Sequence, residues 1–285
     1  MFVIVGWLLA LACVFGVFIA HGGNIGVVLK ALPFEMTTIA GAAAGAFLAA
    51  NPMKVVKASM SGVVACMKGS KHTKTRYLEL LGLLYGVLQK ARKDGMMSIE
   101  SDVEDPGKSA LFAKFPNILA DHHVMEFITD YLRMMVTGNL NAHEIETLMD
   151  SEIETHHQEG HAPVAAVTRL AGGLPAFGIV AAVLGVVNTM GSVGQPPAIL
   201  GAMIGSALVG TFLGILLSYA IVEPLSGMLE HRLEEGTKEL QCVKATLLAS
   251  MQGYSPQVAI EFGRKVLFSD MRPKFLELEA HVKRK

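Results

Sequence analysis

The sequence predicts an all-α fold, that of a polytopic membrane protein with four transmembrane helices and a helical cytoplasmic domain. Hydrophobic residues make up 52% of the 285 positions, and the mean hydropathy is +0.45, both high for a water-soluble domain. Several apolar runs reach the length of about 20 residues that a membrane-spanning helix needs. The polar stretches between them show helical periodicity interrupted by Gly and Pro, without the alternation typical of strands.

Two apolar segments at the start of the chain predict the first membrane helices. Residues 2–20 carry no charge and include the only tryptophan, Trp7. The first basic residue is Lys30, so the segment lacks the positive start of a cleaved signal peptide and we expect it to be retained. A turn that includes Pro33 precedes the second predicted helix, residues 34–50, in which Gly41 and Gly45 offer a face for close helix packing.

Residues 51–163 are polar and predict a helical cytoplasmic domain. An amphipathic helix is expected over residues 72–92, with Tyr77, Leu80, Leu81, Leu84, Val87 and Leu88 on one face. Asp121 is placed to cap a helix that Gly138 would end. Asn141 and Glu144 have the spacing of a capping box for a further helix, expected to end near Gly160.

A second pair of apolar segments predicts the third and fourth membrane helices, residues 167–190 and 198–222. Pro175 lies in the third. In the fourth, Gly201 and Gly205 form one small-residue pair and Gly210 and Gly214 form another, on the opposite face. The remainder, residues 223–285, predicts a cytoplasmic helical tail, in which Ser255 followed by Pro256 begins a helix.

Basic residues predict the topology. All Lys and Arg residues except Lys30 and Arg169 lie in residues 51–163 and 223–285. The positive-inside rule therefore places these regions, and with them both termini, in the cytoplasm.

Composition also excludes some classes of function. A formal net charge of −1 offers no basic surface for nucleic acid. The three cysteines, Cys13, Cys66 and Cys242, are far apart and have no metal-site spacing.

Within the four predicted spans no Asp, Glu, Lys or Arg is expected at mid-bilayer depth, although an ion path generally needs a titratable or ligating group there. A second protein is therefore expected to supply that group.

Several blocks of sequence carry a resemblance to a known family. The spacing of Ala207, Gly210, Thr211, Phe212, Gly214 and Pro224, together with the stretch that begins Leu174-Pro175-Ala176-Phe177-Gly178, resembles the MotA/TolQ/ExbB family of ion-driven motor proteins, and within it the flagellar stator subunits. Further similar blocks include residues 95–100, 118–121, 148–150 and 258–265.

The resemblance implies an inner-membrane stator subunit, without cofactor or metal, that forms a proton channel with a single-span, peptidoglycan-binding partner of the MotB type. It implies a pentamer around a partner dimer and contact with the rotor protein FliG. Carried over by position, the ion path would include Pro175, Thr211 and Pro224, and the rotor contacts would be Arg92 and Glu100. Ala182 occupies a position where sodium-driven relatives typically have threonine, so we expect the coupling ion to be the proton.

Other functions remain to be weighed against this one. A TolQ- or ExbB-like energiser of the outer membrane shares the last two membrane helices but lacks the hairpin of residues 2–50. His157 and His161 have the i,i+4 spacing of zinc ligands, but Gln158 stands where a metalloprotease has glutamate. A hydrolase would need a nucleophile beside a general base, and the predicted spans offer no serine and histidine pair and no paired carboxylates for this. A passive membrane scaffold would not account for the arrangement of Thr211 and Pro224.

Overall fold

A computed structural model describes residues 2–138 and 141–284, whose regular secondary structure is helical, with no strand. They form two compact units. Unit 1 comprises residues 1–69 and 159–231, and unit 2 comprises residues 70–158 and 232–285. Helices α8 (Ala142–Met190) and α10 (Glu223–Met251) contribute residues to both units.

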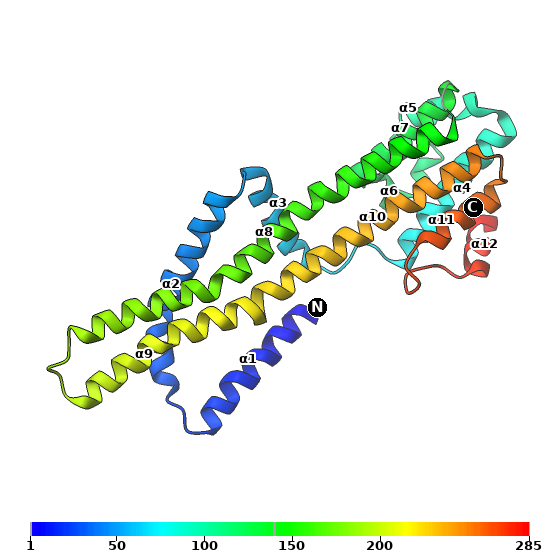
Figure 1. Ribbon diagram of the computed structural model, residues 1–285. Helices are drawn as coiled ribbons and strands as arrows, with labels where there is room; N and C mark the ends of the chain where they lie inside the picture. Colours follow the sequence, from blue (N-terminus) through cyan, green and yellow to red (C-terminus); the bar gives the residue numbers. More distant parts are fainter. Residues whose placement is uncertain (1, 139–140, 285) are drawn as a thin grey trace. The chain divides into compact units, whose positions relative to one another are not determined.

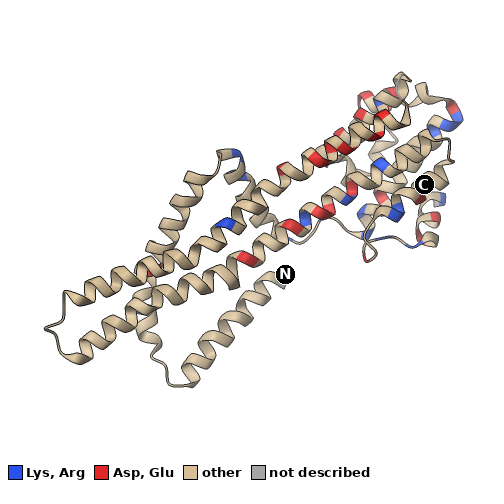
Figure 2. Cartoon of the chain, in the orientation of Figure 1, with Lys and Arg blue, Asp and Glu red and all other residues tan. Residues whose placement is uncertain are grey.

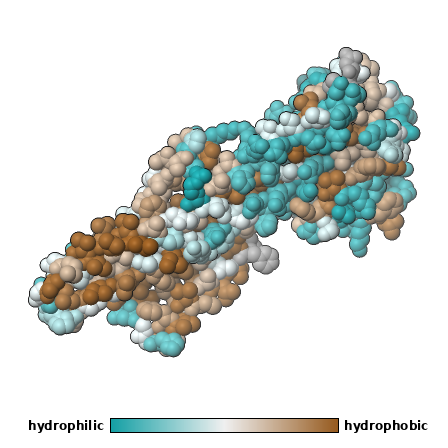
Figure 3. Space-filling model, viewed as in Figure 1, coloured by the Kyte–Doolittle hydropathy of each residue, from teal (hydrophilic) through white to brown (hydrophobic). Residues whose placement is uncertain are grey.

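Unit 1 contains the four long apolar helices (Figure 1). The first two are α1 (Phe2–Ala20) and α2 (Ile25–Ala50), and the others are the apolar part of α8 and the helix α9 (Pro197–Leu216). A π-helical segment, Leu217–Val222, joins α9 to α10. Each of the four is long and apolar enough to cross a membrane, and many of their apolar side chains are exposed, as the brown surface in Figure 3 shows. Exposed apolar surface of this kind suits lipid or a neighbouring subunit.

Two helix boundaries differ from the expected ones. Helix α2 begins at Ile25 and continues through Pro33, whereas the sequence predicted a start at residue 34. Helix α8 does not end near Gly160 but runs through Pro163 to Met190. Proline interrupts only one hydrogen bond of a helix, and packing around it offsets that loss.

Unit 2 packs short helices around α4 (Lys74–Asp94). The expected apolar face of α4 is confirmed, because Tyr77, Leu80, Leu81, Leu84, Val87 and Leu88 are each at most 2% exposed. The other elements are a 3₁₀ turn at Met96–Ile99, α5 (Glu100–Glu104), a 3₁₀ turn at Phe112–Lys114, α6 (Pro116–Leu119), α7 (His122–Thr137), α11 (Pro256–Val266) and α12 (Phe275–Arg284). Helix α3 (Met53–Met67) belongs to unit 1.

The predicted helix ends in unit 2 are mostly confirmed. Gly138 ends α7 in the left-handed conformation, with φ of 74°. Asn141 and Glu144 form the capping box, in which the Glu144 backbone N–H donates to Asn141 Oδ1 at 2.9 Å. Ser255 caps α11 by accepting a hydrogen bond from the Val258 N–H. Asp121 lies at the N-cap position of α7, but its side chain makes no capping hydrogen bond, because its carboxylate binds two cations of unit 2 instead.

Candidate functional site: an ion path along two membrane helices

Helices α8 and α9 lie side by side in unit 1 and contact each other through their backbones (Figure 1). A Cβ added to Gly178 would stand 2.7 Å from the Gly210 carbonyl oxygen and 3.0 Å from Gly214 Cα, and one added to Gly185 would stand 2.7 Å from Ala207 Cβ. Only glycine fits at such close approaches. The pair Gly210 and Gly214 thus forms the predicted packing face, whereas Gly201 meets no atom within 4 Å.

Pro175 creates an unpaired carbonyl that a distant serine satisfies. Because proline has no N–H, the carbonyl oxygen of Ala171 loses its helical donor. The Ser218 hydroxyl donates to this oxygen at 2.7 Å, and Ser218 is only 1% exposed. Ser218 lies in the π-helical segment that precedes Pro224, and such segments are frequent at functional sites. No local sequence pattern indicates this pairing, because the two residues are 47 positions apart.

Ala182 and Thr211 lie at the same level of the α8–α9 contact. A Cβ on Gly210, the residue before Thr211, would stand 3.1 Å from the backbone nitrogen of Ala182. Ala182 is buried and Thr211 is half-buried. Of these two residues only Thr211 has a side-chain oxygen.

The predicted prolines lie at other levels. Pro175 is half-buried and precedes Ala182 by seven residues, about 10 Å along α8 at 1.5 Å per residue. Pro224 is exposed, directly after the first residue of α10. It follows Thr211 by 13 residues, about 20 Å along a helix. The structure thus brings Ala182 and Thr211 together but not Pro224.

Glu35 is an acidic residue inside one of the four long apolar helices, where the predicted spans placed it only at a helix start. Because α2 begins nine residues earlier than expected, Glu35 lies well inside this helix and not at its start. Its Oε2 atom is 2.6 Å from the position that a Cβ on Gly210 would take. Gly210 is about midway between Pro197 and Val222, the ends of the fourth apolar stretch. Sequence reasoning missed this position of Glu35 because it placed the helix start after Pro33, whereas the helix continues through that proline.

The two predicted rotor contacts lie on the surface of unit 2. Arg92 is in the last turn of α4 and Glu100 is the first residue of α5, and both are exposed. Gly95, with φ of 89°, and a 3₁₀ turn connect the two helices. Figure 2 shows that charged residues concentrate on unit 2, while the apolar helices of unit 1 are almost uncharged.

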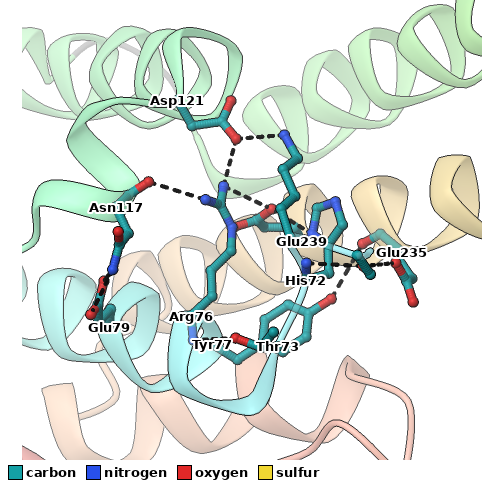
Figure 4. Close-up of polar contacts among 11 residues, drawn as sticks. His72, Thr73, Arg76, Tyr77, Glu79, Asn117, Asp121, Glu235 and Glu239 are labelled. Carbon is teal, nitrogen blue, oxygen red and sulfur yellow. Dashed lines mark hydrogen bonds and ion pairs between the residues drawn. The ribbon is translucent and has the colours of Figure 1, made fainter. Parts of the chain in front are cut away.

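A buried network of charges connects α4 to α10 and to the start of α7 within unit 2 (Figure 4). Arg76 is at its centre: its Nε donates to Glu239 Oε1 at 2.8 Å, and its Nη2 donates to Asp121 Oδ2 at 2.6 Å. His72 Nδ1 lies 3.0 Å from Glu239 Oε2, and Lys71 reaches Asp121 at 2.7 Å. The side chains of Arg76, Glu239 and His72 are all less than 10% exposed, so the network is internal to the unit.

Asp121 remains a carboxylate in this network. Burial alone would raise the pKa of Asp121, but hydrogen bonds and charge from Lys71 and Arg76 outweigh burial and hold the pKa below its ordinary value. The network therefore contributes stability that depends on ionised carboxylates.

The histidine pair that suggested zinc has other contacts. His157 Nδ1 lies 3.3 Å from the Thr237 hydroxyl oxygen. Among the residues described, no three His, Cys, Asp or Glu side chains are grouped closely enough to hold a metal ion.

Two family models match this chain. Residues 4–95 match "Motility protein A N-terminal", and residues 120–242 match "MotA/TolQ/ExbB proton channel family". Motility protein A of Salmonella typhimurium and that of Escherichia coli are each 47% identical over 283 residues, which are 99% of this chain and 95% of each relative. Chemotaxis protein LafT of Vibrio parahaemolyticus is 38% identical, over 96% of this chain and 95% of the relative.

Two solved structures have a similar fold. The structure of C. jejuni MotAB matches with a TM-score of 0.76 and 22% identity, over 94% of this chain and 96% of that chain. The flagellar MotAB stator complex from Bacillus subtilis matches with a TM-score of 0.72 and 24% identity, over 90% of this chain and 92% of that chain.

Proposed function

This chain belongs to the MotA/TolQ/ExbB proton channel family and is a stator subunit of the bacterial flagellar motor, and we propose that it forms its ion path together with a single-span partner of the MotB type. The function rests on one observation: this chain is 47% identical to the motility proteins of two bacteria over 99% of its length. The match of residues 4–95 to the N-terminal part of motility protein A favours the stator subunit over a TolQ- or ExbB-like energiser. The protein is therefore placed in the inner membrane.

The partner would complete a path that this chain leaves incomplete. The backbones of α8 and α9 contact each other along Gly178, Gly210 and Gly214, so an ion has no passage between these two helices. A path would instead run along their exposed side, against another protein. We propose a pentamer of this chain around a partner dimer, with both termini in the cytoplasm. Pro175, Ala182, Thr211 and Pro224 would lie along that path.

Pro175 and the π-helical segment suggest how ion movement could be coupled to motion. Pro175 frees the Ala171 carbonyl, which accepts a hydrogen bond from Ser218 on the neighbouring element, and breaking and re-forming this bond would give the helix pair two arrangements. Protonation of a partner carboxylate beside these helices would then shift the balance between two arrangements of unit 1.

Arg92 and Glu100 would contact FliG. Both side chains are exposed, and neither forms a hydrogen bond or ion pair with the residues that the structure describes. Exposed ion pairs contribute about 0.2–1 kcal/mol each, so contacts of this kind can form and break at every step of rotation.

The coupling ion is proposed to be the proton. A sodium ion stripped of water needs several oxygen ligands together, and Ala182 supplies none where Thr211 supplies one hydroxyl. Each proton that crosses releases about 2.3 kcal/mol per 100 mV.

Motility restored in a strain without its own stator subunits tests the function. The strain receives this chain together with its single-span partner, and swimming speed is followed against external sodium at fixed membrane potential. We expect speed to be independent of sodium and abolished by a protonophore. Speed that rises with sodium and survives the protonophore would contradict the proton, and cells that stay immotile despite both proteins in the membrane would contradict the function.

A further inference from the structure

Glu35 is the only acidic residue in the apolar stretches of the four long helices. Residues 2–20 and 197–222 contain no charged residue, and the apolar part of α8 contains only Arg169. Helix α2 itself carries Lys30 and Glu35. An ionisable side chain inside a membrane span is costly and is usually retained for function.

The carboxyl group of Glu35 reaches the place where three helices meet. Its Oε2 atom approaches Gly210 of α9 so closely that a Cβ there would be 2.6 Å away, and the same Cβ would be 3.1 Å from Ala181 Cβ and 3.1 Å from the Ala182 nitrogen on α8. Gly210 is therefore enclosed between Glu35 and α8. Thr211 follows directly, so the carboxyl group lies at the level of the ion path that we proposed above.

Among the residues that the structure describes, no side chain neutralises Glu35, which forms no hydrogen bond and no ion pair with them. The hydroxyls on its own helix are occupied, since Thr37 donates to the Pro33 carbonyl and Thr38 to the Phe34 carbonyl. Lys30 is five positions away, off the i,i+4 spacing that would pair it on the helix. Arg169 is twelve positions from Ala181, about 18 Å along α8.

We propose that Glu35 is a proton-binding group of this chain, which accepts and releases a proton during transport. The proposal rests on the proposed function. In the step, an O–H bond of the partner's carboxylic acid or of a hydronium ion breaks and an O–H bond to Glu35 forms, and the reverse transfer to water regenerates the carboxylate. No other bond changes. A half-buried carboxyl group with no ion pair among the described residues can take part in such an exchange because protonation removes the cost of its charge.

Proton influx into vesicles that hold this chain with its single-span partner tests the proposal. We expect Glu35→Gln, which keeps the shape but cannot ionise, to slow influx at least about tenfold. Glu35→Asp, which keeps the carboxyl group, should give an intermediate rate. The matched control is Glu230→Gln, which makes the same change at an exposed position of α10.

A direct readout separates proton binding from a role in packing. An infrared difference spectrum across a pH step should contain a carboxyl band that Glu35→Gln removes and Glu35→Asp shifts. Wild-type influx in the Gln variant, or slowed influx with an unchanged spectrum, would overturn the proposal while the stator function stands. If Glu35→Gln does not assemble, the spectrum of Glu35→Asp decides, and a carboxyl band that is not shifted overturns the proposal.

Absence of influx from the wild-type complex would overturn both proposals, and sodium influx in place of protons would overturn the assignment to protons.

Discussion

The carboxylate of Asp121 binds two cations inside unit 2, Arg76 at 2.6 Å and Lys71 at 2.7 Å. Replacement by asparagine leaves Arg76 with one carboxylate partner, Glu239, and the Asn117 carbonyl oxygen. We expect Asp121→Asn to lower the free energy of unfolding by about 1–3 kcal/mol at neutral pH. Denaturant unfolding of the detergent-solubilised protein, followed by circular dichroism, measures this change, and Asp94→Asn at an exposed position is the control.

The stability difference between wild type and Asp121→Asn should depend on pH. Because the pKa of Asp121 is lower in the folded state than in the unfolded chain, the unfolded chain binds more protons, and stability rises with pH over that interval. The contribution is fully present above the ordinary carboxyl pKa of about 4 and is lost as the pH falls through the folded pKa. The gap between wild type and Asp121→Asn should therefore close in acid. A constant gap at all pH values would show that the charge of Asp121 is not the cause.

Arg92 tests the proposed surface for the rotor. Neutralisation, Arg92→Ala, would remove one proposed ion pair with the rotor and should reduce swimming only mildly. Reversal, Arg92→Glu, adds repulsion to the lost attraction and should reduce swimming strongly while membrane assembly stays intact. Swimming speed and co-purification with the partner are the measurements, and Lys265→Glu, at another exposed position of unit 2, is the control. Normal swimming of Arg92→Glu, or failure of that variant to assemble, would remove Arg92 from the rotor surface.

The pairing of α8 with α9 depends on a few glycines. We expect Gly178→Ala to force the two helices apart, because the new methyl group would stand 2.7 Å from a backbone oxygen that cannot move independently. Overpacking of this kind costs about 1–3 kcal/mol. Gly172→Ala changes the same helix where no atom lies within 4 Å, so it should leave the melting temperature nearly unchanged. Equal melting temperatures for the two variants would contradict the close contact.

The junction of α9 and α10 depends on Ser218. Ser218→Ala removes the only described donor to the Ala171 carbonyl that Pro175 leaves free, and an unsatisfied buried acceptor costs about 1–3 kcal/mol. Ser206→Ala, which removes a hydroxyl from α9 that forms no hydrogen bond among the described residues, should cost much less. Thermal unfolding measures both. We also expect Ser218→Ala to change motility more than its loss of stability alone would, and normal motility would argue against a role of this bond in the motion of the helices.

The sequence predicts which segments are helical better than it predicts where the helices begin and end. Apolar length and composition identified the long helices, and periodicity identified the buried face of α4. The predicted start of α2 after Pro33 and the predicted helix end near Gly160 are wrong, because both helices continue through these residues and tertiary packing compensates for the hydrogen bond that a proline removes. The position of Glu35 was missed for the same reason.

Contacts between distant parts of the chain were beyond sequence reasoning. Arg76 and Glu239 are 163 positions apart, and no local pattern indicates that they pair inside unit 2. The juxtaposition of Ala182 with Gly210 likewise depends on how two helices pack and not on either segment. In contrast, the roles of Arg92 and Glu100 came entirely from resemblance to a family, and their exposure is compatible with those roles.

The molecule as a whole is proposed to transport protons only when its partner completes the path. Proton influx into vesicles under an imposed membrane potential measures this most directly, with this chain alone compared with this chain plus the single-span partner. We predict influx at the level of empty vesicles for the chain alone, because Glu35 is a single titratable group and the α8–α9 contact is closed. With the partner present, influx should be well above that level. Influx through the chain alone at the rate of the complex would contradict the account.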